Sequence, residues 1–392
     1  MSTRPRVVTF VPDTSEDEDI SDDDEYRIPK PLDSVFLPES EVSSSDSDSS
    51  DEEQVTRNQS SSSSSAVKKT KKVKTVWADE GIEFNESSNV FLGCESLPDE
   101  IMRLETPMVF FKFLFPSSVI NLIETQSNLY ATQIAPENST EVTHEDIRKF
   151  IGILIYMSVV HLPTTRHYWK DGTFIEKVAS VMTCNKFEQI KRFLHFFDKN
   201  EERKPDDPNY DKLQKIRPFL NILRDRLLKV PKEEYLAIDE QMIPTKARTS
   251  GIRQYNAKKP HKWGYLNYVL SGSSRFSYDF EVFPGKHSGL PENRSDLGVP
   301  GNIVQRLLKN VPSNLNYKIF VDNWYTSLPL MATLHKKGFL PLGTIQLNRA
   351  PGLDLQKKAL MKSERGYCVE KSTVVQLSVT TWVDNKVVSL GR

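Results

Sequence analysis

Two short apolar stretches in the second half of the chain each lead into an acidic residue. The first, Tyr235–Ile243, reads YLAIDEQMI and lies between two prolines, and the second, Tyr317–Trp324, reads YKIFVDNW. Short apolar runs of this kind, bounded by turn-forming residues, are typical of buried strands. The pattern therefore predicts two buried strands that deliver Asp239 and Asp322 to one edge of a sheet.

Between residues 89 and 232 the apolar residues recur at helical spacing instead. Acidic residues two and three positions after Thr143 are typical of a capped helix start. The histidines of this region have no metal-ligand spacing, and we interpret them as structural or surface groups. The expected helices are Pro107–Leu129, a helix from Thr143 to the residue before Pro163, Lys186–Phe197 and Asp211–Lys229.

From residue 235 onward the pattern predicts strands followed by alternating helices and strands. Trp263–Leu270 and Phe276–Phe283 are expected to pair as a hairpin. The order strand, hairpin, helix, strand, helix, strand predicts an α/β class with an RNase H-like mixed sheet as its core, over residues 233–346. A doubly wound nucleotide-binding fold is disfavoured, because the opening strands lack crossover helices and no glycine-rich phosphate loop follows them. The later elements are Asn302–Lys309, Tyr317–Trp324, Ser327–Lys337 and Phe339–Gln346.

Residues 1–88 have the composition of a disordered tail. Its first 66 residues hold 17 acidic and 5 basic side chains, with several runs of serine. Such segments bury too little apolar surface to fold, so we expect a solvating tail, or one that acid-directed kinases modify. The run KKTKKVK follows and indicates either nuclear import or an arm that contacts phosphates, although short lysine runs also arise by chance. Its lysines are Lys68, Lys69, Lys71, Lys72 and Lys74.

The remaining 326 residues are basic, with 47 basic and 36 acidic side chains. A basic body suits a polyanionic ligand, and ordinary lysine-rich solubility explains the surplus equally well. The cysteines Cys94, Cys184 and Cys368 are too widely spaced to predict a disulfide framework or a zinc site. With no apolar run of membrane-spanning length and no signal-peptide core, we expect a soluble intracellular protein without a membrane partner.

Asp239 and Asp322 are the candidate catalytic residues and metal ligands. Cleavage of a phosphodiester is assisted by two Mg²⁺ ions roughly 3.5–4 Å apart, and Mg²⁺ prefers hard oxygen ligands. Aspartates at the ends of adjacent strands could share such ions. The alternative, that each acid caps a nearby backbone amide, remains open at this point.

A basic loop, Arg248–Lys262, follows the strand of Asp239 and reads RTSGIRQYNAKKPHK. Basic and aromatic residues beside an acidic metal centre are typical of a surface that neutralises a phosphate backbone. The alternative is a solvated, charged hairpin. The candidate nucleic-acid contacts here are Arg248, Arg253, Lys258, Lys259 and Lys262, interleaved with Tyr255 and His261.

Several ordered motifs resemble those of piggyBac transposases and their domesticated relatives. They are LAIDEQMIPTKAR, YNAKKPHKWGY, VDNWYTSLPL, GTIQLNR and WVDNKVVSL, preceded by HLPTTRHYWKDG and FEQIKRFLHFFDKN, and together they cover residues 90–392 approximately. The resemblance implies an RNase H-like core in a helical setting for dimerisation and DNA binding, with Mg²⁺-dependent strand transfer at TTAA sites. It gives the first two catalytic places to Asp239 and Asp322, and implies DNA and a second copy, rather than a small molecule, as partners.

The chain departs from the family pattern in three places. The third aspartate of the family lies on a late helix beyond the WVDNKVV strand, and Asp354 and Asp384 do not match it. The cysteine-rich zinc-binding tail has no counterpart before Arg392. In GTIQLNR, Gln346 stands where the family usually has arginine, whereas Arg349 is kept as a candidate nucleic-acid contact.

These departures lead to one expectation and two alternatives. The expectation is a nuclear, C-terminally truncated transposase that holds Mg²⁺ weakly and binds DNA without strand transfer, with residues 347–392 beginning an inserted β-rich region. The first alternative is a domesticated DNA- or chromatin-binding protein. The second is a metal-dependent nuclease unrelated to transposition.

Overall fold

A computed structural model describes residues 75–392 apart from residues 80, 83–84, 139–140, 248, 258, 286–295, 356 and 375. The chain divides into two units, residues 1–69 and 70–392, and every described residue belongs to the second. The acidic part of the predicted tail and the lysine run at 68–74 therefore lie outside the described residues, as do Arg248 and Lys258.

The first part of the described chain is helical, as predicted. Its largest apolar cluster packs residues of α3, α4 and α6 around Phe150, Phe187 and Ile190. Thr143 caps α4 through a reciprocal pair of hydrogen bonds with Asp146. The helices are α1 (Asp99–Met102), α2 (Pro107–Leu114), α3 (Ser117–Ile134), α4 (His144–Met157), α5 (Glu176–Ala179), α6 (Cys184–Phe193) and α7 (Arg217–Leu228).

All four predicted helices of this region differ in their bounds: α4 ends at Met157 rather than before Pro163, and α6 spans Cys184–Phe193 rather than Lys186–Phe197. Proline accounts for the other two differences. The helix expected over Pro107–Leu129 is divided at Phe115 and Pro116, because a proline cannot donate the backbone hydrogen bond of a continuing helix. The helix expected from Asp211 begins only at Arg217, with a proline in its first turn. Asp211 instead closes the preceding turn by accepting a hydrogen bond from the Arg217 guanidinium at 2.6 Å.

Within the described residues, ten strands form one mixed sheet. Five of them run across it in the order β5, β4, β2, β6, β7, which is third, second, first, fourth and fifth along the chain. β2 pairs antiparallel with β4 and parallel with β6, and β6 pairs parallel with β7. This confirms the predicted α/β class and RNase H-like core. The strands are β1 (Trp77–Ala78), β2 (Tyr235–Pro244), β3 (Gln254–Tyr255), β4 (Trp263–Gly272), β5 (Ser277–Val282), β6 (Lys318–Val321), β7 (Leu340–Thr344), β8 (Cys368–Thr373), β9 (Ser378–Val383) and β10 (Val387–Gly391).

The last three strands continue the same sheet. β10 pairs antiparallel with β7, and β9 and β8 follow outward from it, so the predicted boundary at residue 346 does not separate two sheets. β1 pairs with β8 at the outer edge, and Trp77 Nε1 donates to the carbonyl of Pro351 at 3.1 Å. The predicted tail boundary at residue 88 is therefore too late, because residues 77–78 belong to the sheet.

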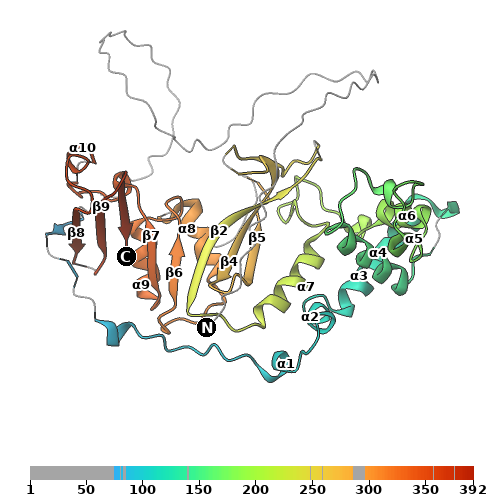
Figure 1. Cartoon of the computed structure of the whole chain (residues 1–392), viewed down its shortest axis with the longest axis horizontal. Coiled ribbons are helices and arrows are strands. Elements are labelled where there is room, and N and C mark those ends of the chain that lie inside the picture. The colour runs from blue at the N-terminus through green and yellow to red at the C-terminus, as the bar shows by residue number, and fades with distance from the viewer. Residues whose placement is uncertain are drawn as a thin grey trace, which may run out of the picture. The chain divides into compact units, whose positions relative to one another are not determined.

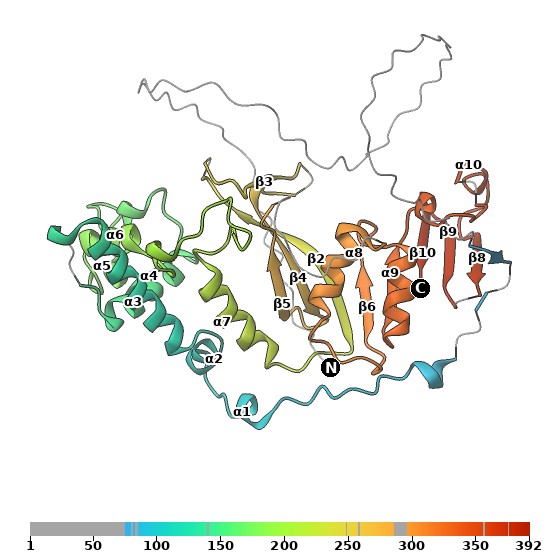
Figure 2. The same ribbon diagram turned by 180° about the vertical axis from the view of Figure 1, so that it is seen from behind.

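Two helices lie beside the central strands (Figures 1 and 2). They are α8 (Gly298–Leu307) and α9 (Leu328–Lys336), and their apolar residues join those of β2, β4, β5 and β6 in one cluster. Leu236 and Ile238 of β2 are 0% and 2% exposed. Burial of each such side chain contributes about 1.5–3 kcal/mol, which fixes the strand that carries Asp239 at the centre of the core.

None of the helices in the described part of the chain combines the length and the apolar character that a membrane span requires. The bent pair α2 and α3, which meet at 57°, meets the length and composition test only when both helices are taken together.

A carboxylate pins the β4–β5 hairpin to the start of β2. Glu233 accepts hydrogen bonds from the hydroxyls of Ser273 and Ser274, the Ser274 amide at 2.9 Å and the Tyr278 hydroxyl at 2.8 Å. Partial burial raises the pKa of Glu233, but these hydrogen bonds outweigh it and lower the pKa to about 2 from an ordinary value of 4.5.

Glu233→Gln is expected to destabilise the chain by about 1 kcal/mol at pH 7, a modest value because the carboxylate is partly exposed. Since the folded pKa is depressed, this contribution is present above pH 4.5 and is lost as the pH falls toward 2. Urea unfolding at several pH values measures it. The exposed Glu105→Gln is the control, and a difference between wild type and Glu233→Gln that stays constant from pH 7 to pH 2 would contradict the assignment.

Candidate functional site

The parallel pairing of β2, β6 and β7 ends at one level of the core, while β2 itself continues to Pro244. Ile238 of β2 is the partner of Val321 of β6, and Val321 is the partner of Gly343 of β7. The residues that follow are Asp239, Asp322 and Thr344, so these three form a row across neighbouring strands. Adjacent strands lie roughly 4.8 Å apart, which places the two aspartates within reach of one ion. The structure thus brings together the two acids that the sequence singled out.

Each aspartate makes a local hydrogen bond and remains exposed. Asp239 Oδ1 accepts from the Glu240 amide at 2.8 Å, and Asp322 Oδ1 accepts from the Asn323 amide at 2.5 Å. Asp322 Oδ1 also accepts from the Thr344 hydroxyl at 3.2 Å. The amide contacts that formed the alternative interpretation are therefore present. They occupy one oxygen of each aspartate and leave both carboxylates open to solvent.

Glu240 is a third acid at this edge, and sequence reasoning missed it. Lys259 binds it twice, through its carboxylate at 3.2 Å and its backbone carbonyl at 3.0 Å, and the Tyr325 hydroxyl lies 3.4 Å away. Burial raises the pKa of Glu240, the neighbouring Asp239 raises it further, and Lys259 opposes both. The sequence feature that could have identified Glu240 is its place directly after Asp239, together with Lys259 in the loop that follows β2.

The basic loop lies between β2 and β4 and contains the short strand β3. Lys259 is engaged by Glu240, Arg253 lies over the Trp263 ring, and Lys262 is exposed. Their role as nucleic-acid contacts stays a prediction, as it does for Arg248 and Lys258, which lie outside the described residues.

Arg349 points toward the Asp322 loop. Its Nη1 donates to the backbone carbonyls of Asn323 at 2.7 Å, Trp324 at 2.9 Å and Thr326 at 3.4 Å. A single guanidinium thus holds the turn that follows β6 and fixes the backbone on which Asp322 sits. A phosphate contact by Arg349 stays a prediction, while the structure gives this arginine a positioning role.

The acids at this edge fit a magnesium ion in part. Mg²⁺ in proteins is often held by one or two carboxylates, with water and substrate phosphate completing the octahedron, and Asp239 and Asp322 supply such a pair. Among the described residues, no group of three or more acids, histidines and cysteines is arranged to hold a metal. Asp384 instead pairs with Arg365 at the β9–β10 turn. The two-aspartate set therefore fits one weakly held ion better than a closed metal centre.

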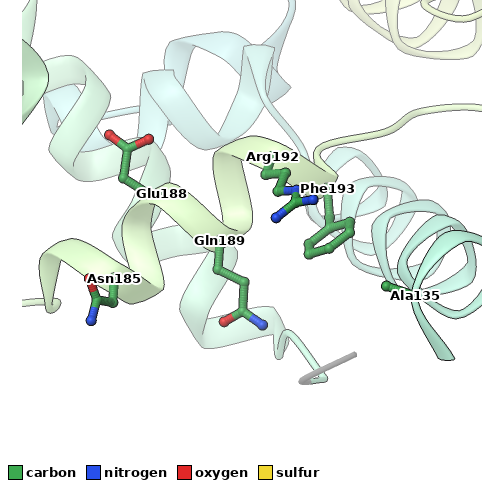
Figure 3. A pocket seen from close by; sticks show the side chains of 6 residues that line it. All are labelled: Ala135, Asn185, Glu188, Gln189, Arg192 and Phe193. Atoms are coloured by element: carbon green, nitrogen blue, oxygen red, sulfur yellow. The ribbon is translucent and has the colours of Figure 1, made fainter. Parts of the chain in front are cut away.

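A hollow on the helical region is separate from these residues. It is lined by residues of α6, chiefly polar, and by Ala135 after α3, and it contains none of the predicted site residues (Figure 3). Its polar side chains are Asn185, Glu188, Gln189 and Arg192. The hollow is therefore not part of the candidate site at Asp239 and Asp322.

Comparison with known proteins identifies similar chains. A family model described as Transposase IS4 matches residues 106–391. PiggyBac transposable element-derived protein 2 of Homo sapiens is 29% identical over 294 residues, which cover 73% of this chain and 48% of that protein. PiggyBac transposable element-derived protein 3 of Homo sapiens is 28% identical over 296 residues, which cover 74% and 48%. The chain thus spans about half the length of these curated relatives.

A solved structure has a similar fold. It is titled "Cryo-EM structure of piggyBac transposase synaptic complex with hairpin DNA", and the match has a TM-score of 0.64 at 21% identity. The match covers 75% of this chain and 62% of that one. At this identity the likeness establishes the shared fold, in agreement with the strand order of the core.

Proposed function

The chain belongs to the piggyBac transposase family, and from that premise we propose that it binds DNA at the sheet edge where Asp239 and Asp322 meet. The carrying observation is the register that sets Ile238 opposite Val321, and so makes the two aspartates neighbours on parallel strands. The basic composition of the body supports a polyanionic ligand.

The proposed metal is Mg²⁺, held by Asp239 and Asp322. When bound, the ion would neutralise charge on a phosphate and lower the pKa of a coordinated water. Other residues of the chain orient these ligands. Thr344 and the Asn323 amide donate to the Asp322 carboxylate, and Arg349 holds the turn that follows it. Lys259 offsets the charge of Glu240, which otherwise would repel a phosphate.

We propose that this 392-residue chain binds DNA without completing strand transfer at TTAA sites. The family resemblance implies three aspartates, and the described residues place only two of them together. A domesticated DNA- or chromatin-binding protein is the second candidate, favoured by the same observation. A nuclear location and a homodimer complete the proposal, on the basis of the lysine run and the family resemblance.

Labelled 30-base-pair duplexes test the proposal by fluorescence anisotropy over a range of salt. Binding is expected to weaken with a slope of about −0.9 in log K against log salt for each phosphate contact. The 392-residue chain is also expected to leave supercoiled plasmid uncut in Mg²⁺. Absence of duplex binding at low salt would overturn the DNA-binding proposal. Nicking that Asp239→Asn abolishes would overturn the proposal that the chain does not cut.

A further inference from the structure

β2 and β4 continue as a two-stranded ribbon beyond Asp239, as far as the pair Pro244 and Gly264. An exposed pair of aromatic residues lies at the far end of this ribbon. Tyr255 of β3 and Trp263 of β4 are directly opposite partners, and their ring centroids are 4.9 Å apart. Trp263 is 47% exposed and Tyr255 is 37% exposed. Two large rings that are held together and yet remain open to solvent offer apolar faces to a flat ligand.

Arg253 stacks on the Trp263 ring of this pair. Its guanidinium carbon lies 4.1 Å from the centroid of the Trp263 ring. Its Nε is buried and, within the part of the chain that the structure describes, has no hydrogen-bond acceptor. The Arg253 side chain as a whole is only partly buried, so a guanidinium that a ring already orients can meet a phosphate through donors other than the buried Nε, in charge-assisted hydrogen bonds.

The backbone around the pair is fixed by the sheet. A Cβ added to Gly264 would lie 2.5 Å from the Ile243 carbonyl oxygen, so β2 and β4 approach one another closely beside Trp263. The Asn256 amide donates to the carbonyl of Lys262 at 2.7 Å and closes the loop between the two rings. The two rings are therefore held in place by hydrogen-bonded, closely packed strands.

The pair lies at a defined spacing from the acids. Asp239 is opposite Val269, and Trp263 precedes Val269 by six residues on β4. At about 3.3 Å per residue this separation is about 20 Å along the ribbon. One strand of DNA rises 3.4 Å per nucleotide, so the same distance is about six nucleotides.

We propose that Trp263, Tyr255 and Arg253 form a stacking platform for an unpaired nucleotide of DNA, about six positions from the phosphate at the aspartates. This inference rests on the proposed DNA-binding function. Bases within a duplex are already stacked and hide their faces, whereas an unpaired base can stack on a ring while its phosphate meets Arg253. The platform therefore favours single-stranded or gapped DNA over an intact duplex.

Anisotropy with three labelled DNAs tests the platform: a 30-base-pair duplex, the same duplex with a three-nucleotide gap, and an unstructured single strand. A stacked base is worth about 1–3 kcal/mol on alanine substitution, so Trp263→Ala should weaken binding of the gapped and single-stranded DNA between about fivefold and 150-fold. Duplex binding should change less than twofold. Trp263→Phe should retain most of the affinity, and Arg253→Ala should lower the salt slope by about one phosphate contact.

Tyr367→Ala, which removes an exposed ring elsewhere on the chain, is the matched control and should alter none of the three affinities. If Trp263→Ala fails to fold, Trp263→Leu keeps an apolar side chain but has no aromatic face, and it should show the same loss. Equal effects of the Trp263 variants on duplex and gapped DNA, or no effect on either, would overturn the platform and leave the proposed function intact. Failure of the wild type to bind any of the three DNAs would overturn both.

Discussion

Replacing Asp279 with alanine is expected to lower the free energy of unfolding by about 3–5 kcal/mol. Asp279 of β5 is fully buried and binds Arg224 of α7 through two hydrogen bonds, Nε to Oδ1 at 2.7 Å and Nη2 to Oδ2 at 3.0 Å. The variant leaves a largely buried guanidinium without its counter-charge. Because a domain has only about 5–15 kcal/mol of net stability, this loss should be visible as a large shift in the urea midpoint.

Two variants make this expectation specific. Arg103→Ala removes an ion pair whose side chains are 82% and 86% exposed, and it should leave the midpoint unchanged within error. The double variant Arg224→Met with Asp279→Leu should recover part of the loss, since an apolar pair can replace a buried ion pair. A loss below about 1 kcal/mol for Asp279→Ala would show that the pair does not anchor α7 to the sheet.

Asp322→Asn is expected to weaken the binding of Mn²⁺, used as a spectroscopic substitute for Mg²⁺, by about tenfold or more. The variant removes one of two carboxylate charges, and ligand charge is a main determinant of affinity for hard cations. Asparagine keeps the Oδ1 atom that accepts from the Asn323 amide and Thr344, so the turn should remain folded. Titration by electron paramagnetic resonance measures the free Mn²⁺.

The control is Asp384→Asn, which removes an exposed carboxylate that pairs with Arg365 at the β9–β10 turn. It should leave Mn²⁺ binding unchanged, whereas Asp239→Asn should match Asp322→Asn. Wild-type affinity for Mn²⁺ in either Asp239→Asn or Asp322→Asn would show that the two aspartates do not share an ion.

The strands and helices that sequence reasoning located correctly are those with strong local signals. β2 was predicted as Tyr235–Ile243 and spans Tyr235–Pro244, because an apolar run between prolines has few alternatives. The start of α4 was predicted from the cap at Thr143 and the acids after it. The helix predicted through Pro116 was wrong, because its apolar spacing continued across a residue that cannot sustain a helix.

The site was predictable only in part. The order of elements predicted that Asp239 and Asp322 lie on neighbouring strands, and the register agrees. It did not show that Arg349 holds the Asp322 turn, that Lys259 binds Glu240, or that Thr344 completes the row. These contacts join residues 19 to 26 positions apart across loops, where local patterns carry no information on which side chains meet.

By itself the sequence determined the α/β class, the succession of strands and helices, the family and the pair of acids, because each follows from short-range periodicity or from ordered motifs. Only the tertiary structure decided the register that aligns Asp239, Asp322 and Thr344. It alone also showed that Arg349 donates to the backbone of the turn after β6. It also decided that residues 77–78 join the far edge of the sheet against β8, some 300 residues later. The reason is physical: strand pairing is selected by burial and hydrogen bonding summed over the whole core, and no local segment contains that sum.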